Sequence, residues 1–449
     1  MFYTILIIFV LGYICIALEH PLKVNKTATA LVLGVAVWTL YLLGGPGIYE
    51  FTNFSAGFDA FKAAHPDVAH PFIDYIVNHE MFDHLAEIAE TLFFLLGAMT
   101  IVEVIDRHHG FRIITDLIRT RNVVKLLWLL AIITFFLSAV LDNLTTTIVM
   151  ISLLRKLVSD KKDRWFFAGI IIIAANAGGV WSPIGDVTTI MLWIGNKISA
   201  SQIIMKAFVP SFVSLIVPLI FTSFAMKHKA NTMPEIDDCQ KSTVPSWQRN
   251  LIFCIGIGAL LFVPIFKTIT HMKPYMGVLL GLGVLWIITE VIHRKETEEN
   301  KDLHIAAIIS RIDTPSILFF LGILLAVAGL QSAGHLSLLA SGLNEAFAGT
   351  FLIIDVVIGV LSSIVDNIPL VAGAMGMYDF PMNHPFWTFL AYCAGTGGSI
   401  LIIGSAAGVT AMGMEKIDFI WYLKKITPYA LIGYLAGAGT YMLMDLILH

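Results

Sequence analysis

Long apolar segments separated by short polar ones make up most of this chain of 449 residues. A helix needs about 20 consecutive apolar residues to cross a bilayer. By that measure the pattern predicts simple membrane-spanning helices at about 2–18, 27–43, 88–105, 207–226, 250–268, 275–292, 315–333 and 426–446. Four further apolar segments have the wrong length for a simple span, and polar residues interrupt all four.

The first of these segments covers residues 126–154, which is too short for two crossings. A polar run, Leu141-Asp142-Asn143-Leu144-Thr145-Thr146-Thr147, lies near its midpoint. Basic residues flank the segment on both sides, and Lys and Arg mark the cytoplasmic side of a membrane protein. Since both ends then lie on one side, we expect a re-entrant helical hairpin that opens to the cytoplasm, with Asp142 and Asn143 at its tip.

The second segment, 165–195, is too long for one span and is interrupted between Asn176 and Thr189. Three glycines and Pro183 lie in that interruption, and both residue types weaken the interior of a helix. The pattern therefore predicts two half-helices joined by an unwound link.

The second half of the chain repeats this plan. Another short apolar segment, 351–377, has Asp366 and Asn367 near its middle, and 386–413 is again broken by glycines. Aligning the glycine pair 178–179 with 397–398 also aligns Gly185 with Gly404. We therefore expect two repeats, 1–226 and 250–449, joined by a polar cytoplasmic linker at 227–249.

The distribution of charge predicts how the two repeats are oriented. No Lys or Arg occurs between Arg311 and Lys416, so the second hairpin has no basic flank and is expected to open outward. Five crossings in each half would also invert the second half. The predicted fold is an all-α polytopic membrane protein with an inverted repeat, a plan shared by many secondary transporters, with both termini on the outer side.

Composition supports the assignment to the membrane. Hydrophobic residues make up 57% of the chain and charged residues 13%, and the mean hydropathy is +0.82. A soluble domain carries about 25% charged residues. The net charge of −4 argues against a nucleic-acid partner, and the four cysteines show no metal-ligand spacing. The first apolar segment lacks a basic start, so we interpret it as a retained span.

The two hairpin tips and the breaks of the two broken helices would converge if the repeat is real. Their polar groups are Asp142, Asn143, Thr145, Thr146, Asn176, Asp186, Thr188, Thr189, Asp366, Asn367, Thr396, Ser399 and Ser405. These side chains are hard oxygen donors, which suit a small cation such as Na⁺. The set includes three carboxylates but no Lys, Arg or His, so an anion would meet like charge.

A buried carboxyl group can hold either a proton or a metal ion, but not both. Competition of this kind would couple proton flow to cation flow in opposite directions. The sequence thus predicts a cation/proton exchanger rather than an enzyme, with no cofactor besides the transported ions.

The polar run at 142–147, the Asn-Ala-Gly-Gly stretch from Asn176 to Thr189 and the Asp-Asn-Ile-Pro stretch from Asp366 resemble the NhaD-type Na⁺/H⁺ antiporters. That family belongs to the ion transporter superfamily. The resemblance implies exchange of Na⁺ or Li⁺ for H⁺, a role in pH homeostasis, residence in a bacterial inner membrane and a homodimer. It also implies a Na⁺ site at Asp142, Asn143, Asn176, Asp186, Asp366 and Asn367.

Other interpretations stay open at this point. Sodium-coupled dicarboxylate symporters of the same superfamily carry Ser-Asn-Thr where this chain has Asp142-Asn143-Leu144, and that replacement argues against an anion substrate. Each hairpin aspartate could serve only as a helix cap. An intramembrane aspartyl protease would need Gly-x-Gly-Asp, but residue 183 is proline. Glu90 is a candidate for a proton path.

Overall fold

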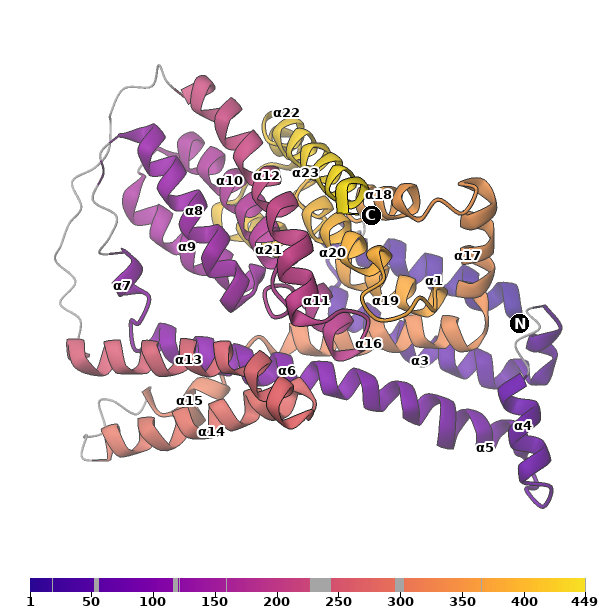
Figure 1. Cartoon of the computed structure of the whole chain (residues 1–449). Helices are drawn as coiled ribbons and strands as arrows, with labels where there is room; N and C mark the ends of the chain where they lie inside the picture. The colour runs from indigo at the N-terminus through magenta and orange to yellow at the C-terminus, as the bar shows by residue number, and fades with distance from the viewer. Residues whose placement is uncertain are drawn as a thin grey trace. The chain divides into compact units, whose positions relative to one another are not determined.

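The computed structural model describes residues 1–17, 19–51, 56–115, 120, 122–158, 160–226, 244–294, 303–364 and 366–448. Its regular structure is entirely helical throughout these ranges (Figure 1). Eight of the described helices are long and apolar enough to cross a membrane: α3 (Lys26–Gly44), α6 (Met81–Arg107), α8 (Val123–Leu141), α12 (Ala200–Met226), α13 (Ser246–Thr270), α14 (Pro274–His293), α16 (Thr314–Ser332) and α23 (Thr427–Leu448). The chain is a multi-pass membrane protein, as its hydropathy predicts.

Seven of the eight predicted spans correspond to such helices. The predicted span 2–18 forms α1 (Phe2–Ala17), which has only 16 residues, whereas α8, expected to be one arm of a hairpin, has 19 residues and is itself long and apolar enough to cross.

One span is longer than expected. A helical stretch leads into α6 through α5 (Pro71–Tyr75) and a π-helical turn (Ile76–Glu80), so the candidate span begins at Pro71. The polar segment 44–84, for which the hydropathy predicts no span before residue 88, also contains a 3-10 helix (Pro46–Phe51) and α4 (Ala56–Ala64). Most of the described part of this segment is therefore helical. Its apolar residues, such as Phe58 and Phe72, are buried against one another.

Short helices complete the described chain. They are α1 (Phe2–Ala17), α2 (Glu19–Leu22), α7 (Arg112–Thr115), α15 (Ile305–Ile309), α17 (His335–Ala346) and α22 (Phe419–Lys425). Most of the expected linker, residues 227–243, lies outside the described residues, as do 116–119 and 121 in the basic segment that follows α6.

Both predicted hairpins and both predicted broken helices are interrupted where the polar residues occur. The first hairpin consists of α8 and α9 (Asn143–Leu157), and the first broken helix of α10 (Lys161–Gly179) and α11 (Val187–Ile194). In the second half the corresponding elements are α18 (Phe351–Leu361) with α19 (Asn367–Met377), and α20 (Pro385–Gly397) with α21 (Ala406–Glu415). The break after α20 starts later than expected, so Thr396 is still helical.

The chain forms two compact units, and each unit takes residues from both halves of the sequence. Unit 1 comprises 1–93, 313–354 and 368–380, and α3 packs on α16 within it. Gly34 and Gly322 let these two backbones approach closely, because a Cβ at Gly34 would lie 2.7 Å from the carbonyl oxygen of Gly322. The indole nitrogen of Trp38 donates to the backbone carbonyl of Leu325 at 2.9 Å.

Unit 2 comprises 94–312, 355–367 and 381–449, and it contains every residue of the predicted ion site. Within it α8 and α9 pack on α10, α12 packs on α23, and α13 packs on α14 (Figure 1). The α12–α23 contact uses two glycines of α23. A Cβ at Gly433 would lie 2.3 Å from the carbonyl oxygen of Ser214, and one at Gly437 would lie 2.5 Å from that of Pro210.

Matched contacts in unit 2 relate the two hairpins. The Ser138 hydroxyl of α8 donates to the carbonyl of Ala175 at 2.6 Å, and the Ser362 hydroxyl after α18 donates to the carbonyl of Ala394 at 2.7 Å. The two serines are 224 residues apart, as are Asp142 and Asp366. Each hairpin therefore binds its own broken helix through the same hydrogen bond.

Glycines make a second matched contact at these crossings. A Cβ at Gly178 would lie 2.1 Å from the carbonyl oxygen of Phe135, and a Cβ at Gly397 would lie 2.0 Å from that of Gly359. No side chain fits at either position without moving a backbone. The glycines that weaken the helices thus also hold each broken helix directly against a hairpin.

Candidate ion-binding site

Asp142 occupies the break between α8 and α9. Its backbone is in the left-handed region, with φ of 81°, which turns the chain sharply at this point. One carboxylate oxygen accepts from the backbone N–H of Thr145 at 2.8 Å, and the other accepts from the Thr145 hydroxyl at 2.9 Å. Asp142 therefore caps α9, and the positive end of the helix stabilises its charge.

Asp186 is the residue on which three of the four segments meet. It is 1% exposed and caps α11, accepting from the backbone N–H of Thr188 at 2.9 Å and from its hydroxyl at 3.0 Å. The amide nitrogen of Asn143 donates to the second carboxylate oxygen at 2.9 Å, and that of Asn367 donates to the same oxygen at 3.3 Å. Both hairpin tips thus contact one buried carboxylate.

Asn176 connects the fourth segment to this centre. Its side-chain carbonyl accepts from the amide of Asn143 at 3.0 Å. Its own amide nitrogen donates to the hydroxyls of Ser399 and Ser405, each at 2.9 Å. Asn176 is completely buried, and its hydrogen bonds join residues of both halves of the sequence into one network.

Asp186 and Ser405 play equivalent structural roles in the two repeats. Asp186 has φ and ψ of −145° and 147°, and Ser405 has −145° and 155°. Ser405 caps α21 by accepting from the backbone N–H of Gly408 at 3.2 Å. The equivalent capping position thus has a carboxylate in the first repeat and a hydroxyl in the second. At this position, only the first repeat contributes a negative charge to the network.

The remaining threonines of the predicted site differ in their contacts. The hydroxyl of Thr189 donates to the backbone carbonyl of Asp186 at 2.8 Å, and that of Thr396 donates to the carbonyl of Tyr392 at 2.5 Å. The Thr146 hydroxyl is buried and has no hydrogen-bond partner among the described residues. A buried polar atom without a partner is rare in native proteins, and it marks an oxygen available to a ligand.

Asp366 and Glu90 complete the set of predicted residues. Asp366 directly precedes α19 and is half-buried, one residue before the Asn367 that reaches Asp186. Glu90 is a half-buried residue of α6 and belongs to unit 1. No group of three His, Cys, Asp or Glu side chains that could hold a metal ion was found in the part of the chain that the structure describes. A cation at the network would therefore depend on amide, hydroxyl and carbonyl oxygens as well as carboxylates.

Sequence reasoning missed two buried acidic residues in unit 2. Glu415, at the end of α21, pairs with Arg155 at 2.6 Å and with Arg164 at 3.0 Å. Asp355 lies inside α18 and is fully buried. The signal for Asp355 is present in the sequence, because it is the one charged residue in an otherwise apolar helix of 11 residues.

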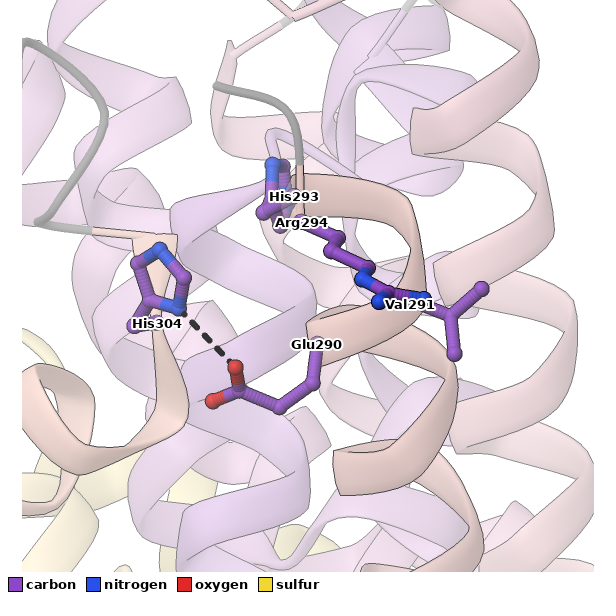
Figure 2. Close-up of a pocket in the computed structure, with 5 residues that line it drawn as sticks. All are labelled: Glu290, Val291, His293, Arg294 and His304. Carbon is purple, nitrogen blue, oxygen red and sulfur yellow. Dashed lines mark hydrogen bonds and ion pairs between the residues drawn. The ribbon is translucent and has the colours of Figure 1, made fainter. Parts of the chain in front are cut away.

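A surface pocket at the end of α14 lies apart from the predicted residues. It is lined by Glu290, Val291, His293, Arg294 and His304 (Figure 2). Figure 2 shows the His304 ring directed at the Glu290 carboxylate, and the two groups are 3.3 Å apart. The ring of His293, which lines this pocket, is hydrogen-bonded to the ring of His108 at 2.9 Å.

Comparison with known proteins identifies relatives over nearly the whole chain. A family model described as citrate transporter (CitMHS) matches residues 13–391. "Sodium/proton antiporter 2" of Arabidopsis thaliana is 44% identical over 442 residues, which cover 97% of this chain and 98% of that protein. "Sodium/proton antiporter 1" of the same plant is 46% identical over 97% of this chain and 71% of its own length. "Na(+)/H(+) antiporter NhaD" of Vibrio parahaemolyticus is 31% identical over 78% of this chain and 89% of that protein.

Proposed function

Because this chain belongs to the citrate transporter (CitMHS) family of the ion transporter superfamily, we propose that it exchanges Na⁺ or Li⁺ for H⁺ across the membrane. The resemblance of its motifs to the NhaD-type antiporters is confirmed by the relatives. The relatives named sodium/proton antiporters cover almost all of this chain, and their names favour exchange over citrate transport.

The observation that carries the proposal is the buried carboxylate of Asp186 between the two hairpin tips. Asn143 and Asn367 donate to it from the first and second hairpins. A carboxylate buried in a membrane protein is costly unless it is paired, and the sequence places no Lys, Arg or His in the four segments. A cation or a proton can supply the missing positive charge.

The proposed Na⁺ ligands are the residues that the four segments contribute. They include Asp142, Asn143, Asn176, Asp186, Asp366 and Asn367, with Thr145, Thr188, Thr189, Ser399 and Ser405 beside them. Thr146 joins the set because its buried hydroxyl has no partner in the described chain. Thr396 contributes less to this proposal, since its hydroxyl already donates to a helix carbonyl.

Exchange follows from competition at these carboxylates. When Na⁺ occupies the site the carboxylates are ionised, and when Na⁺ leaves, protons replace its charge. Each carboxyl group therefore alternates between a cation and a proton, and neither ion crosses without the other moving back. The helix breaks at Asp142, 180–186 and 398–405 allow the surrounding half-helices to change position as the occupant changes.

A sodium-coupled anion symporter is the second candidate, because the matching family model is described as a citrate transporter. The two functions differ in the charge that the site must accept. The three aspartates at the hairpin tips and helix breaks would repel citrate, and no basic residue in the four segments would bind it. Uptake of radiolabelled citrate that depends on Na⁺ would favour this candidate.

Finer features of the proposal follow from the resemblance and from the pattern of charge. We infer a homodimer, residence in the inner membrane of a bacterium, and both termini on the outer side. The positive-inside distribution of Lys and Arg supports the orientation. A cysteine placed at residue 2, labelled by a membrane-impermeant maleimide in intact cells, tests it against labelling at a cytoplasmic control position.

The test of the function is a flux assay with purified protein in liposomes. A preset pH gradient is monitored with a fluorescent dye, and Na⁺ or Li⁺ is added outside. We expect each ion to dissipate the gradient, while choline does not. The proposal fails if neither ion moves protons at any pH from neutral to alkaline.

A further inference from the structure

Asp355 is a buried carboxyl group that the network around Asp186 does not include. It lies in α18, the first helix of the second hairpin, and is 0% exposed. Neither carboxyl oxygen has a hydrogen-bond partner in the part of the chain that the structure describes. An ionised carboxylate in such a place has neither water nor a partner to stabilise it, whereas a protonated one is neutral.

Tyrosine hydroxyls connect the helix of Asp355 to its neighbours. Tyr434 donates to the backbone carbonyl of Val356 at 2.9 Å, and Tyr392 donates to the carbonyl of Tyr434 at 2.8 Å. These contacts hold one face of α18 against α20 and α23.

Asp355 lies on the same helix as a glycine that contacts the second broken helix. Asp355 and Gly359 are four residues apart in α18, which places them on one side of the helix. Gly359 touches the backbone of α20, since a Cβ there would lie 2.6 Å from the carbonyl oxygen of Cys393. Asp355 and Gly359 thus share the side of α18 that meets the second broken helix.

The first repeat has no equivalent carboxyl group. The spacing of 224 residues that relates Asp142 to Asp366 and Ser138 to Ser362 relates Ala131 to Asp355. Ala131 is buried in α8. The two hairpins therefore carry the same residue types at the tip aspartate and at the serine. At the position of Asp355, however, the first hairpin has an alanine. Hairpin packing alone does not require an acid at this position, because the first hairpin packs with alanine.

We propose that Asp355 is a proton-binding site of the second hairpin. Its carboxylate binds one proton and releases one proton in each cycle, so it carries H⁺ but not Na⁺. Asp355 serves the proton half of the cycle, whereas the network around Asp186 serves both ions. This inference rests on the proposed exchange of Na⁺ for H⁺.

Two transport modes separate a proton role from a structural one. Exchange of ²²Na⁺ for Na⁺ needs no proton, whereas Na⁺/H⁺ exchange does. In liposomes we expect Asp355→Asn to lower the rate of Na⁺/H⁺ exchange by about a hundredfold, because loss of a positioned proton-transfer group typically slows a reaction by at least about that factor. The same variant should leave the rate of Na⁺/Na⁺ exchange unchanged. Asp355→Glu, which keeps the carboxyl group, should restore proton flux with a shifted pH profile. Asp67→Asn, at an exposed turn, is the matched control and should behave as wild type.

An infrared measurement on the wild-type protein tests the proton site without depending on transport. We expect a C=O stretching band of a protonated carboxyl group that shifts in Asp355→Glu, disappears in Asp355→Asn and does not respond to Na⁺. Equal loss of both exchange modes in Asp355→Asn, or an infrared spectrum that this variant leaves unchanged, overturns the inference. A wild-type protein that shows the band but no Na⁺/H⁺ exchange counts against the proposed function instead.

Discussion

The side-chain amide of Asn143 donates to the carboxylate of Asp186 at 2.9 Å. Asn143 begins the second helix of a hairpin, and Asp186 begins the second half of a broken helix, 43 residues later. The bond joins two chain interruptions that would each be unstable alone in a membrane, because their exposed backbone groups would lack partners. The same hydrogen bond therefore pairs the two chain breaks and forms part of the polar site.

Removing the charge from Asp142, Asp186 or Asp366 should stop exchange. In each Asp→Asn variant the amide keeps the shape and can still accept hydrogen bonds, but it holds neither a proton nor a strongly bound cation. We expect proton flux driven by Na⁺ to fall to that of protein-free liposomes, while the protein elutes as wild type from a size-exclusion column. Retained exchange with an unchanged pH profile in these variants would show that the three aspartates do not carry the ions.

Na⁺ should stabilise the folded protein, since the proposed site exists only when the four segments are assembled. At a concentration about 100 times the dissociation constant, binding adds about 2.7 kcal/mol to the free energy of unfolding. We expect the melting temperature in detergent to rise when Na⁺ replaces choline, and to return when Na⁺ is removed by dialysis. Asp186→Asn should abolish this rise. An equal rise in that variant would place the stabilising ion elsewhere.

Ser399 and Ser405 should not contribute equally to stability, although both accept from Asn176 at 2.9 Å. Ser399→Ala removes one hydrogen bond, at a cost of about 1 kcal/mol in the free energy of unfolding. Ser405→Ala also removes the cap of α21, which adds about 0.5–2 kcal/mol. The double variant should lose more than the sum, because the Asn176 amide then has no acceptor. Thermal unfolding of the four proteins measures this, with Ser341→Ala on the exposed side of α17 as control.

Alanine at Gly178 should disrupt the crossing of α8 and α10. The added Cβ would lie 2.1 Å from the carbonyl oxygen of Phe135, so one backbone must move. Overpacking of this kind costs about 1–3 kcal/mol in the free energy of unfolding, and the displaced hairpin should also reduce exchange. Gly439→Ala is the matched control, because nothing lies within 4 Å of its Cβ. If both variants melt at the wild-type temperature, this crossing is not tightly packed.

Neutralising Glu415 should weaken the contact between the first hairpin and α21. Its buried carboxylate pairs with Arg155 and Arg164, and its backbone carbonyl accepts from the indole of Trp165 at 3.0 Å. Breaking a buried ion pair costs about 3–5 kcal/mol, and less here because Arg155 is partly exposed. We expect Glu415→Gln to lower the melting temperature, whereas Glu345→Gln, at an exposed position of α17, should not. Equal melting of the two variants would contradict this role.

The sequence by itself determined the membrane class, most of the spans and the places where helices break. Apolar length sets a span, because about 20 residues match the bilayer core, and the clustered glycines with Pro183 end helices by local sterics. The aspartates could be singled out for the same reason, since a carboxylate is costly within an apolar segment. Local rules were less successful at 44–84, where burial of aromatic side chains stabilises helices that the polar composition hides.

Only the tertiary structure decided which polar groups contact one another. Sequence placed Asn176 in the site, but not its position between Asn143 and the two serines 223 and 229 residues away. The sequence also treated Thr396 and Thr146 as equal candidates for the site. In the structure the Thr396 hydroxyl bonds to its own helix, whereas the Thr146 hydroxyl has no partner in the described chain. The sequence assigned no role to Asp355. Hydrogen bonds and burial depend on neighbours far apart in the chain, and the packing of the two hairpins on the two broken helices supplies those neighbours.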